Sequence, residues 1–386
     1  MKENIKIIRV ATVPISFKTL LKGQLAYIRK HGFDPLMVSA DGDEVDQIIK
    51  EQMAPHISLP LTRKITPISD LKAIYLFYRL CKKRKPQIVH SHTPKAGFIA
   101  MIGAWLAGVK IRLHTVAGLP LMESTGMKRL VLEFVEKLTY KFSTKVYSNS
   151  YQLREFIIAN KFCAENKIKV IGNGSSNGID TMYYSKNDAL LKSSEEIRNL
   201  HGLSSEDFIY IYVGRVVYDK GISELINAFK IISKNKLNFK LLLVGYLEQE
   251  LNPLPDDILF EIEHNKNIKF LGFQEDVRPF FLVSDVLVFP SYREGLPNVP
   301  MQACCLGLPV IATNINGNNE IVIHGENGLL VPVKDTSALA EAMILIADNP
   351  ELFGKLKSNA RDIIINRYDQ KYLWKELVKE YNNNLG

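Results

Sequence analysis

Short apolar runs alternate with longer stretches of helical spacing along the first half of the chain. The runs predict strands at Ile5–Val13, Pro35–Ser39, Gln87–His90, Lys110–Thr115, Lys145–Ser148 and Ile168–Ile171. Between them, helical spacing covers Phe17–His31, Asp43–Gln52, Leu71–Lys83, Ala96–Leu106, Lys128–Phe142 and Leu153–Asn160, with Ser16 as a candidate N-cap. This alternation predicts an α/β fold with a mostly parallel sheet and helices on both faces.

A second alternating series follows the polar, glycine-rich segment Gly172–Asp180, and we place a domain boundary just after it. Expected strands are Phe208–Val213, Phe239–Val244, Asn267–Leu271, Val286–Phe289, Val310–Thr313 and Gly328–Val331; expected helices are Gly221–Ile232, Val277–Leu282, Ser337–Ala347, Pro350–Arg367 and Lys371–Asn384. At 386 residues the chain is too long for one ordinary core. We therefore predict two doubly wound, Rossmann-like domains facing each other across a cleft.

The stretch Ser291–Pro309 places polar chemistry directly after a buried strand. Glu294 and Gly295 lie in the turn, Pro297 marks the expected first residue of a helix, and Gly307 its end. Parallel sheets hold ligands at the carboxyl ends of their strands, and free N–H groups at a helix N-terminus hold anions.

A matching turn, Gly214–Gly221, follows the strand Phe208–Val213. Gly214 allows a ligand to approach the backbone closely. Arg215 and Lys220 flank the turn and are suited to a diphosphate, Arg through a planar fork and Lys as a mobile point charge. The alternative is that Gly214 only closes the turn and both cations are solvated.

The amino-acid composition limits which kinds of binding partner and cofactor the chain is expected to have. The first 180 residues carry 28 Lys and Arg against 14 Asp and Glu, whereas the rest of the chain is acidic, so the first half is expected to meet an anionic partner. No nucleic-acid-binding signature is present. The four cysteines lack metal or redox spacing, Cys304 and Cys305 are expected to fill a core, and a reducing cytoplasm fits. The first turn, 12–16, lacks G-x-G-x-x-G, which argues against an NAD enzyme.

Taken together, the motifs GRVVYDKG, FLGFQEDV, SDVLVFPSYREGLPNVPMQA, GLPVIAT and NGLLV resemble the donor half of the retaining family 4 glycosyltransferases, which have the GT-B fold. The segments HSHTPKAG, RLHTVAGLPLMESTGMKR and GNGSSNGID are similar to a branch that makes bacterial capsule or O-antigen. The resemblance implies an acceptor-binding domain of residues 1–180 plus 366–386 and a donor-binding domain of residues 181–365.

The resemblance also implies donor-binding roles, which are carried over position by position. Gly214, Arg215 and Lys220 would contact the diphosphate, and Phe273 the nucleobase. Glu294 would hold the sugar hydroxyls, and the turn Gly295, Leu296, Pro297 and Asn298 would offer backbone N–H groups. Gln302 stands where the family usually has a second glutamate that grips the ribose, so the ribose contact carries no charge here.

Catalytic and acceptor-side positions are less fixed in the first half. His114 resembles the family histidine near the transferred sugar and is expected to point to the cleft. Alignment on Gly118 puts Ala117 at that position instead. Ser16, His92 and Lys95 are expected on the acceptor side, and His90 with His92 is not expected to bind a metal.

The resemblance implies a hexosyltransferase that moves a sugar from a nucleotide-diphosphate donor, with UDP as the family expectation, to a lipid-linked saccharide with an α-linkage. No metal or other cofactor is expected. The basic segments Lys72–Lys85 and Lys128–Lys145 suit an anionic membrane surface. Two alternatives stay open: a GT-B nucleotide-sugar epimerase, and a catalytically weak nucleotide-sugar-binding partner.

Overall fold

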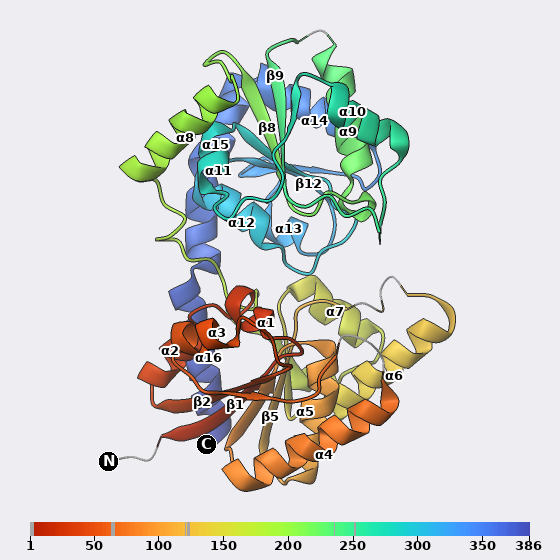
Figure 1. The fold of residues 1–386 in the computed structure, drawn as a ribbon, viewed down its shortest axis with the longest axis vertical. Coiled ribbons are helices and arrows are strands. Elements are labelled where there is room, and N and C mark those ends of the chain that lie inside the picture. Colours follow the sequence, from red (N-terminus) through yellow and green to blue (C-terminus); the bar gives the residue numbers. More distant parts are fainter. Residues whose placement is uncertain (1–3, 63–65, 120, 122–123, 235, 251) are drawn as a thin grey trace. The chain divides into compact units, whose positions relative to one another are not determined.

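The computed structural model describes residues 4–62, 66–119, 121, 124–234, 236–250 and 252–386 (Figure 1). The chain forms two compact units. Unit 1 comprises Met1–Gly178 and Gln370–Gly386, and unit 2 comprises Ile179–Asp369. The boundaries expected from the sequence, after residues 180 and 365, lie two and four residues from these positions. The C-terminal helix α16 (Gln370–Leu385) therefore belongs to the unit that contains the start of the chain.

The strands of unit 1 form one parallel sheet in the order β3-β2-β1-β4-β5-β6-β7. They are β1 (Ile5–Val10), β2 (Phe33–Ser39), β3 (His56–Ser58), β4 (Ile88–Ser91), β5 (Ile111–Val116), β6 (Lys145–Ser148) and β7 (Ile168–Val170). Strand β3 is an edge strand of three residues, too short to be recognised in the sequence.

Alternation along these strands divides the side chains between two helical layers. Ile8, Val10 and Val89 face α4 (Pro67–Arg84) and α5 (Pro94–Leu106). On the same side, α6 (Gly126–Phe142) and α7 (Tyr151–Ala159) cover the second half of the sheet. Ile7 and Ile88 face the opposite layer, which contains α2 (Gln24–Lys30) and α16. The helices α1 (Ile15–Thr19) and α3 (Val45–Gln52) complete that layer.

The single helix expected over Phe17–His31 is wrong, because α1 and α2 are separate helices. Gly23 lies between them with φ of +76°, and a Cβ there would come within 2.9 Å of the Trp374 ring. The close packing of α16 thus fixes the break. Ser16 lies inside α1 and caps no helix.

Unit 2 repeats the architecture with the parallel order β10-β9-β8-β11-β12-β13. These strands are β8 (Phe208–Val213), β9 (Phe239–Val244), β10 (Ile268–Phe270), β11 (Val286–Phe289), β12 (Val310–Thr313) and β13 (Gly328–Val331). Its helices are α8 (Asp188–Leu200), α9 (Ile222–Ser233), α10 (Asp256–His264), α11 (Arg278–Val283), α12 (Asn298–Cys305), α13 (Asn318–Ile321), α14 (Thr336–Asp348) and α15 (Pro350–Tyr368). Helices α8 and α13 were not expected from the sequence.

Both sheets therefore have the predicted doubly wound topology, and each has a point where the strand order reverses. This switch point lies between β1 and β4 in unit 1 and between β8 and β11 in unit 2. Loops that leave adjacent strands in opposite directions open a crevice at such a point, where ligands of these folds bind.

Cys304 and Cys305 are buried in the core of unit 2, as predicted. Over the described ranges, no helix is both long and apolar enough to cross a bilayer.

Candidate functional site

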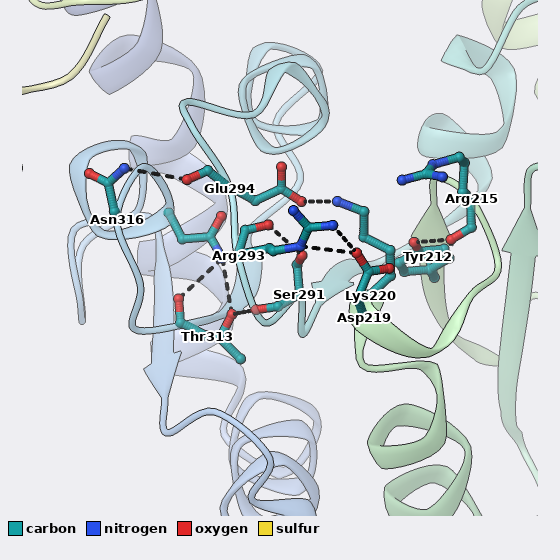
Figure 2. Close-up of polar contacts among 10 residues, drawn as sticks. Tyr212, Arg215, Asp219, Lys220, Ser291, Arg293, Glu294, Thr313 and Asn316 are labelled. Carbon is teal, nitrogen blue, oxygen red and sulfur yellow. Dashed lines mark hydrogen bonds and ion pairs between the residues drawn. The ribbon is translucent and has the colours of Figure 1, made fainter. Parts of the chain in front are cut away.

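The loops after β8 and β11 meet at the switch point of unit 2 (Figure 2). Gly221, with φ of +70°, ends the 3₁₀ turn Tyr218–Lys220 and begins α9. A Cβ on Gly221 would lie 2.1 Å from the carbonyl oxygen of Pro290. Only glycine permits this approach, and it brings the two loops into direct backbone contact.

Lys220 and Glu294 form an ion pair across the two loops. The Nζ–Oε1 distance is 2.7 Å, and the side chains are 17% and 15% exposed. The family resemblance implied a diphosphate contact for Lys220 and a sugar contact for Glu294. The structure brings these two residues together, as Figure 2 shows.

Further contacts between the same loops were not expected from the sequence. Arg293 Nη2 lies 2.8 Å from Asp219 Oδ2, and the Tyr292 N–H donates to the Asp219 carbonyl. The Tyr292 hydroxyl donates to the Glu224 carboxylate at 2.7 Å. Asp219 and Glu224 lie within or just after the GRVVYDKG motif, but spacing alone does not pair them with residues about 70 positions away.

The loop after β12 supports the Glu294 turn from the other side. The Asn316 amide lies 3.3 Å from the Glu294 carbonyl oxygen and 3.4 Å from that of Gly295. Thr313 donates its hydroxyl to the Ser291 carbonyl. Gly317, with φ of +83°, would place a Cβ 2.2 Å from the Gly295 carbonyl oxygen. The loops after β8, β11 and β12 therefore fix the backbone conformation at Glu294.

The turn itself presents unused donors. Among the described residues, no acceptor is recorded for the N–H groups of Gly295 and Leu296. Pro297 is extended at the N-cap and α12 begins at Asn298, so the expected first helical residue is shifted by one. Gln302 is half-buried in the second turn of α12. Because helix N-termini carry partial positive charge, the turn suits an anion next to Lys220.

Arg215 is the second predicted phosphate ligand, and it lies at the surface. Its side chain is 48% exposed and pairs with Glu248 at 3.1 Å. Gly214 has φ of +150°. Its carbonyl oxygen packs closely against Gly245, because a Cβ on Gly245 would lie only 1.8 Å from that oxygen. The buried Tyr212 hydroxyl donates to the Arg215 carbonyl at 2.7 Å, which fixes the backbone at this residue.

Phe273 follows β10 and stacks on Tyr246, which follows β9. The ring centroids are 4.6 Å apart and the planes differ by 6°, while both side chains remain more than half exposed. An exposed, parallel aromatic pair offers a flat apolar surface of the kind on which nucleobases stack. Tyr246 was not singled out in the sequence.

His114 differs from its expected orientation. It lies in β5 and is 1% exposed, with Nδ1 2.8 Å from the Ser91 hydroxyl. Alternation turns it toward α5, where Gly97 makes room for the ring: a Cβ there would lie 2.4 Å from His114 Cε1. Burial lowers its pKa to about 3, so the imidazole is neutral. The expectation that its side chain points to a cleft is wrong.

The predicted acceptor-side residues occupy different surroundings in unit 1. His92 is buried and lines a small cavity, and Ser16 and Lys95 are not among that cavity's lining residues. Lys95, at the start of α5, pairs with Asp70 at 2.6 Å. Ser16 is half-buried in α1. No cluster of His, Cys, Asp and Glu suited to a metal occurs in the part of the chain that the structure describes.

Two protein-family models match this chain, one in each structural unit. Residues 21–174 match the model of the glycosyl transferase 4-like domain, and residues 193–363 match that of glycosyl transferases group 1. The chain is 37% identical to the capsular polysaccharide biosynthesis glycosyltransferase CapM of Staphylococcus aureus, over 98% of this chain and 97% of that protein.

Two other similarities extend this result. The UDP-Gal:alpha-D-GlcNAc-diphosphoundecaprenol alpha-1,3-galactosyltransferase of Escherichia coli is 29% identical over 87% of this chain and 86% of its own. The crystal structure of Anabaena HepE in complex with UDP superposes with a TM-score of 0.81 at 19% identity, over 98% of this chain and all of that one. The latter similarity establishes the fold.

Proposed function

Because this chain belongs to the family 4 (group 1) glycosyltransferases of the GT-B fold, we propose that it moves a sugar from a UDP-sugar to a hydroxyl of a lipid-linked saccharide in surface-polysaccharide synthesis. Transfer proceeds with retention and forms an α-linkage. The observation that carries the proposal is the ion pair of Lys220 with Glu294 beside the N–H groups of Gly295 and Leu296, which have no acceptor among the described residues.

Charge development explains why these groups lie together. Breaking the bond between the sugar and the diphosphate builds negative charge on the leaving phosphate and positive charge on the sugar. In the proposal, the leaving phosphate is stabilised by Lys220, Arg215 and the N-terminus of α12. Removing one such donor typically raises the activation free energy by a few kcal/mol. Glu294 orients the sugar, and a phosphate oxygen of the donor takes the proton of the attacking hydroxyl. A resident metal is not part of the proposal.

The names of the relatives support the choice of substrates. The name of the E. coli relative specifies a UDP-sugar donor, a diphosphoundecaprenol-linked acceptor and an α-1,3 product. The S. aureus relative is named for capsule synthesis. We propose the same chemical classes for this chain and assign no particular sugar.

An acceptor anchored in lipid requires that unit 1 reach a membrane surface, and α6 carries a surface suited to this. Met127, Leu130, Val131 and Phe134 recur at helical spacing and are 75%, 60%, 39% and 62% exposed. The exposed Lys128 and Lys137 lie on the same helix. An exposed apolar stripe with lysines beside it favours the interface of an anionic bilayer. Peripheral binding at the inner face of the cell membrane is therefore proposed.

Donor turnover tests the transfer reaction. The protein is incubated with a panel of sugar nucleotides, with and without undecaprenyl-diphosphate saccharides, and free nucleotide and isomerised donor are measured. The proposal predicts nucleotide release that depends on the acceptor, with an α-linked product by NMR. An isomerised donor would identify an epimerase, and binding without turnover a nucleotide-sugar-binding partner.

Liposome flotation tests the membrane surface separately. The wild-type protein should float with vesicles containing phosphatidylglycerol at low salt, and the double variant Leu130→Glu/Phe134→Glu should not. Leu200→Glu is the matched control, because Leu200 is 78% exposed on α8 in unit 2. Equal flotation of all three proteins would rule out α6 as the docking surface.

A further inference from the structure

Arg9 is a fully buried cation at the switch point of unit 1. It lies on β1 opposite His90 of β4 and is 0% exposed. Its Nε donates to His92 Nε2 at 2.9 Å, and its Nη2 donates to Gln24 Oε1. No carboxylate among the described residues pairs with it, and Nη1 has no partner there. A buried charge without a counter-charge is costly, so this arrangement calls for an anion.

The tautomer of His92 follows from its contact with Arg9. A guanidinium can only donate, so His92 Nε2 accepts and carries no proton. Burial first, and then the charge of Arg9, hold the pKa of His92 well below its usual value, so the ring is neutral and its proton sits on Nδ1. This Nδ1–H is also buried, and it has no partner in the part of the chain that the structure describes.

A third unpartnered group, the Ser176 hydroxyl, lines the same cavity as His92. The cavity has a volume of about 20 Å³, room for about one water-sized sphere, and Gln24, Thr115 and Ser175 are among its other lining residues. Gln24 ties the groups together, because it accepts from Arg9 and donates to the Ser176 carbonyl at 3.1 Å. Ser176 Oγ is buried and has no partner within the described chain.

The neighbouring polar groups already have their partners and do not supply the missing acceptor. His90 contacts the Tyr381 hydroxyl through Nδ1 and the Thr115 hydroxyl through Nε2, both at 2.7 Å. The unpartnered Arg9 Nη1 and His92 Nδ1 can only donate hydrogen bonds, and the Ser176 hydroxyl can also donate one. The ligand they lack is therefore an acceptor, and the charge of Arg9 makes it an anion.

We propose that the cavity lined by His92, Ser176 and Gln24 binds one compact anion, either a free halide-sized ion or a single anionic oxygen of a phosphate group. Arg9 supplies the positive charge from behind this lining, through its contacts with His92 and Gln24. The site lies at the reversal of strand order in unit 1, where doubly wound sheets bind ligands. The anion site does not depend on the proposed transfer reaction. It would also account for the buried charge of Arg9, which the apolar packing of Ile7, Ile88 and Leu113 on the same face of the sheet does not explain.

Thermal unfolding in matched ionic strength tests the site. Sodium gluconate provides the baseline, and sodium bromide or sodium phosphate the anion. The wild-type unfolding temperature should rise with one of them in a saturable manner. In Arg9→Met the rise should disappear, and in Ser176→Ala the apparent dissociation constant should increase several-fold. The exposed Arg84→Met is the control and should respond as the wild type does.

The two anions distinguish the sources. Stabilisation by bromide, with an anomalous scattering peak beside Arg9 in bromide-soaked crystals, indicates a free ion. Stabilisation by phosphate alone indicates the oxygen of a phosphate group. If Arg9→Met does not fold, the anomalous peak and Ser176→Ala still decide the question. No anion-dependent rise in the wild type, or an equal rise in Arg9→Met, overturns the proposal.

Discussion

Lys220 and Glu294 lie 2.7 Å apart, so the group expected to bind the donor phosphate and the group expected to hold the donor sugar neutralise each other's charge. Their side chains are mostly buried, and loss of one partner leaves the other charge uncompensated. In the proposed reaction, the donor diphosphate would add a competing acceptor beside Lys220, and the sugar hydroxyls would offer Glu294 new donors. The ion pair holds both side chains in place, and under the proposed function the donor would replace their mutual contact.

Replacement of either partner should abolish transfer. We expect Lys220→Met and Glu294→Gln each to lower kcat/KM at least about 100-fold, because each removes charge stabilisation or orientation at the reacting bond. The double variant should lose far less than the product of the two effects, since the residues act as a unit. Acceptor-dependent release of nucleotide measures this.

Lys355→Met and Glu326→Gln form the matched control, because that ion pair is about half-exposed on the surface of unit 2. Both should retain wild-type turnover. Near-normal turnover of Glu294→Gln would contradict its assignment to the donor sugar.

Gly221 should be essential for the fold of the site. Ala at this position must adopt φ of +70° and place its Cβ 2.1 Å from the Pro290 carbonyl oxygen. The matched control is Gly202→Ala, because Gly202 has φ of +60° but open space around it. Backbone conformation alone costs about 1–2 kcal/mol. We expect the decrease in unfolding temperature to be several-fold larger for Gly221→Ala than for Gly202→Ala. Equal decreases would contradict the close contact between Gly221 and Pro290.

The aromatic pair should contribute to nucleotide affinity. Phe273→Ala removes one of two stacked rings, and stacking of a base on an aromatic ring is worth about 1–3 kcal/mol. We therefore expect UDP to bind roughly 5- to 150-fold more weakly by isothermal titration calorimetry. Phe260→Ala is the control, since Phe260 is 60% exposed on α10 and stacks on His264. A loss of equal size in both variants would argue against a nucleobase at Phe273.

The sequence predicted the long elements and the topology because each is determined locally. Apolar runs followed by helical spacing specify parallel β–α units, and the structure has both sheets in doubly wound order. The errors fall where tertiary packing decides. The break at Gly23 depends on Trp374, more than 300 residues away, and β3 is too short to carry a pattern.

For the candidate site, too, the locally determined features were predicted from the sequence and the contacts between distant segments were not. Glu294 and Lys220 were found because each stands in a turn after a buried strand. The ion pair of Asp219 with Arg293 and the contact of Asn316 with the Glu294 carbonyl were not found, because pairing across loops requires knowledge of the strand order. His114 shows the reverse error: its position near a strand end suggested exposure, but alternation turns it into the core beside Gly97.

Glu136 provides a titration test of the interior of unit 1. It lies on α6, 4% exposed, and burial raises its pKa to about 7. Nearby Tyr140 and Cys163 have raised pKa values and His114 a lowered one, so these three stay neutral from pH 5 to 8.

The sign of the effect follows from linkage. Between pH 4.5 and 7 the folded state holds a proton that the unfolded state releases, so stability falls as pH rises through this window and levels off above it. Glu136→Gln removes the ionisable group. We expect it to be more stable than the wild type at pH 8, by on the order of 3 kcal/mol, and to differ little at pH 4.5.

Unfolding midpoints in urea at several pH values measure this difference. Glu133→Gln is the control, because Glu133 lies one turn earlier on α6 and pairs with Arg129 at 3.0 Å. Its loss should change stability by no more than about 1 kcal/mol. If Glu136→Gln follows the wild-type pH dependence, the carboxyl group is already ionised without penalty in the folded protein, and its burial does not control the stability of unit 1.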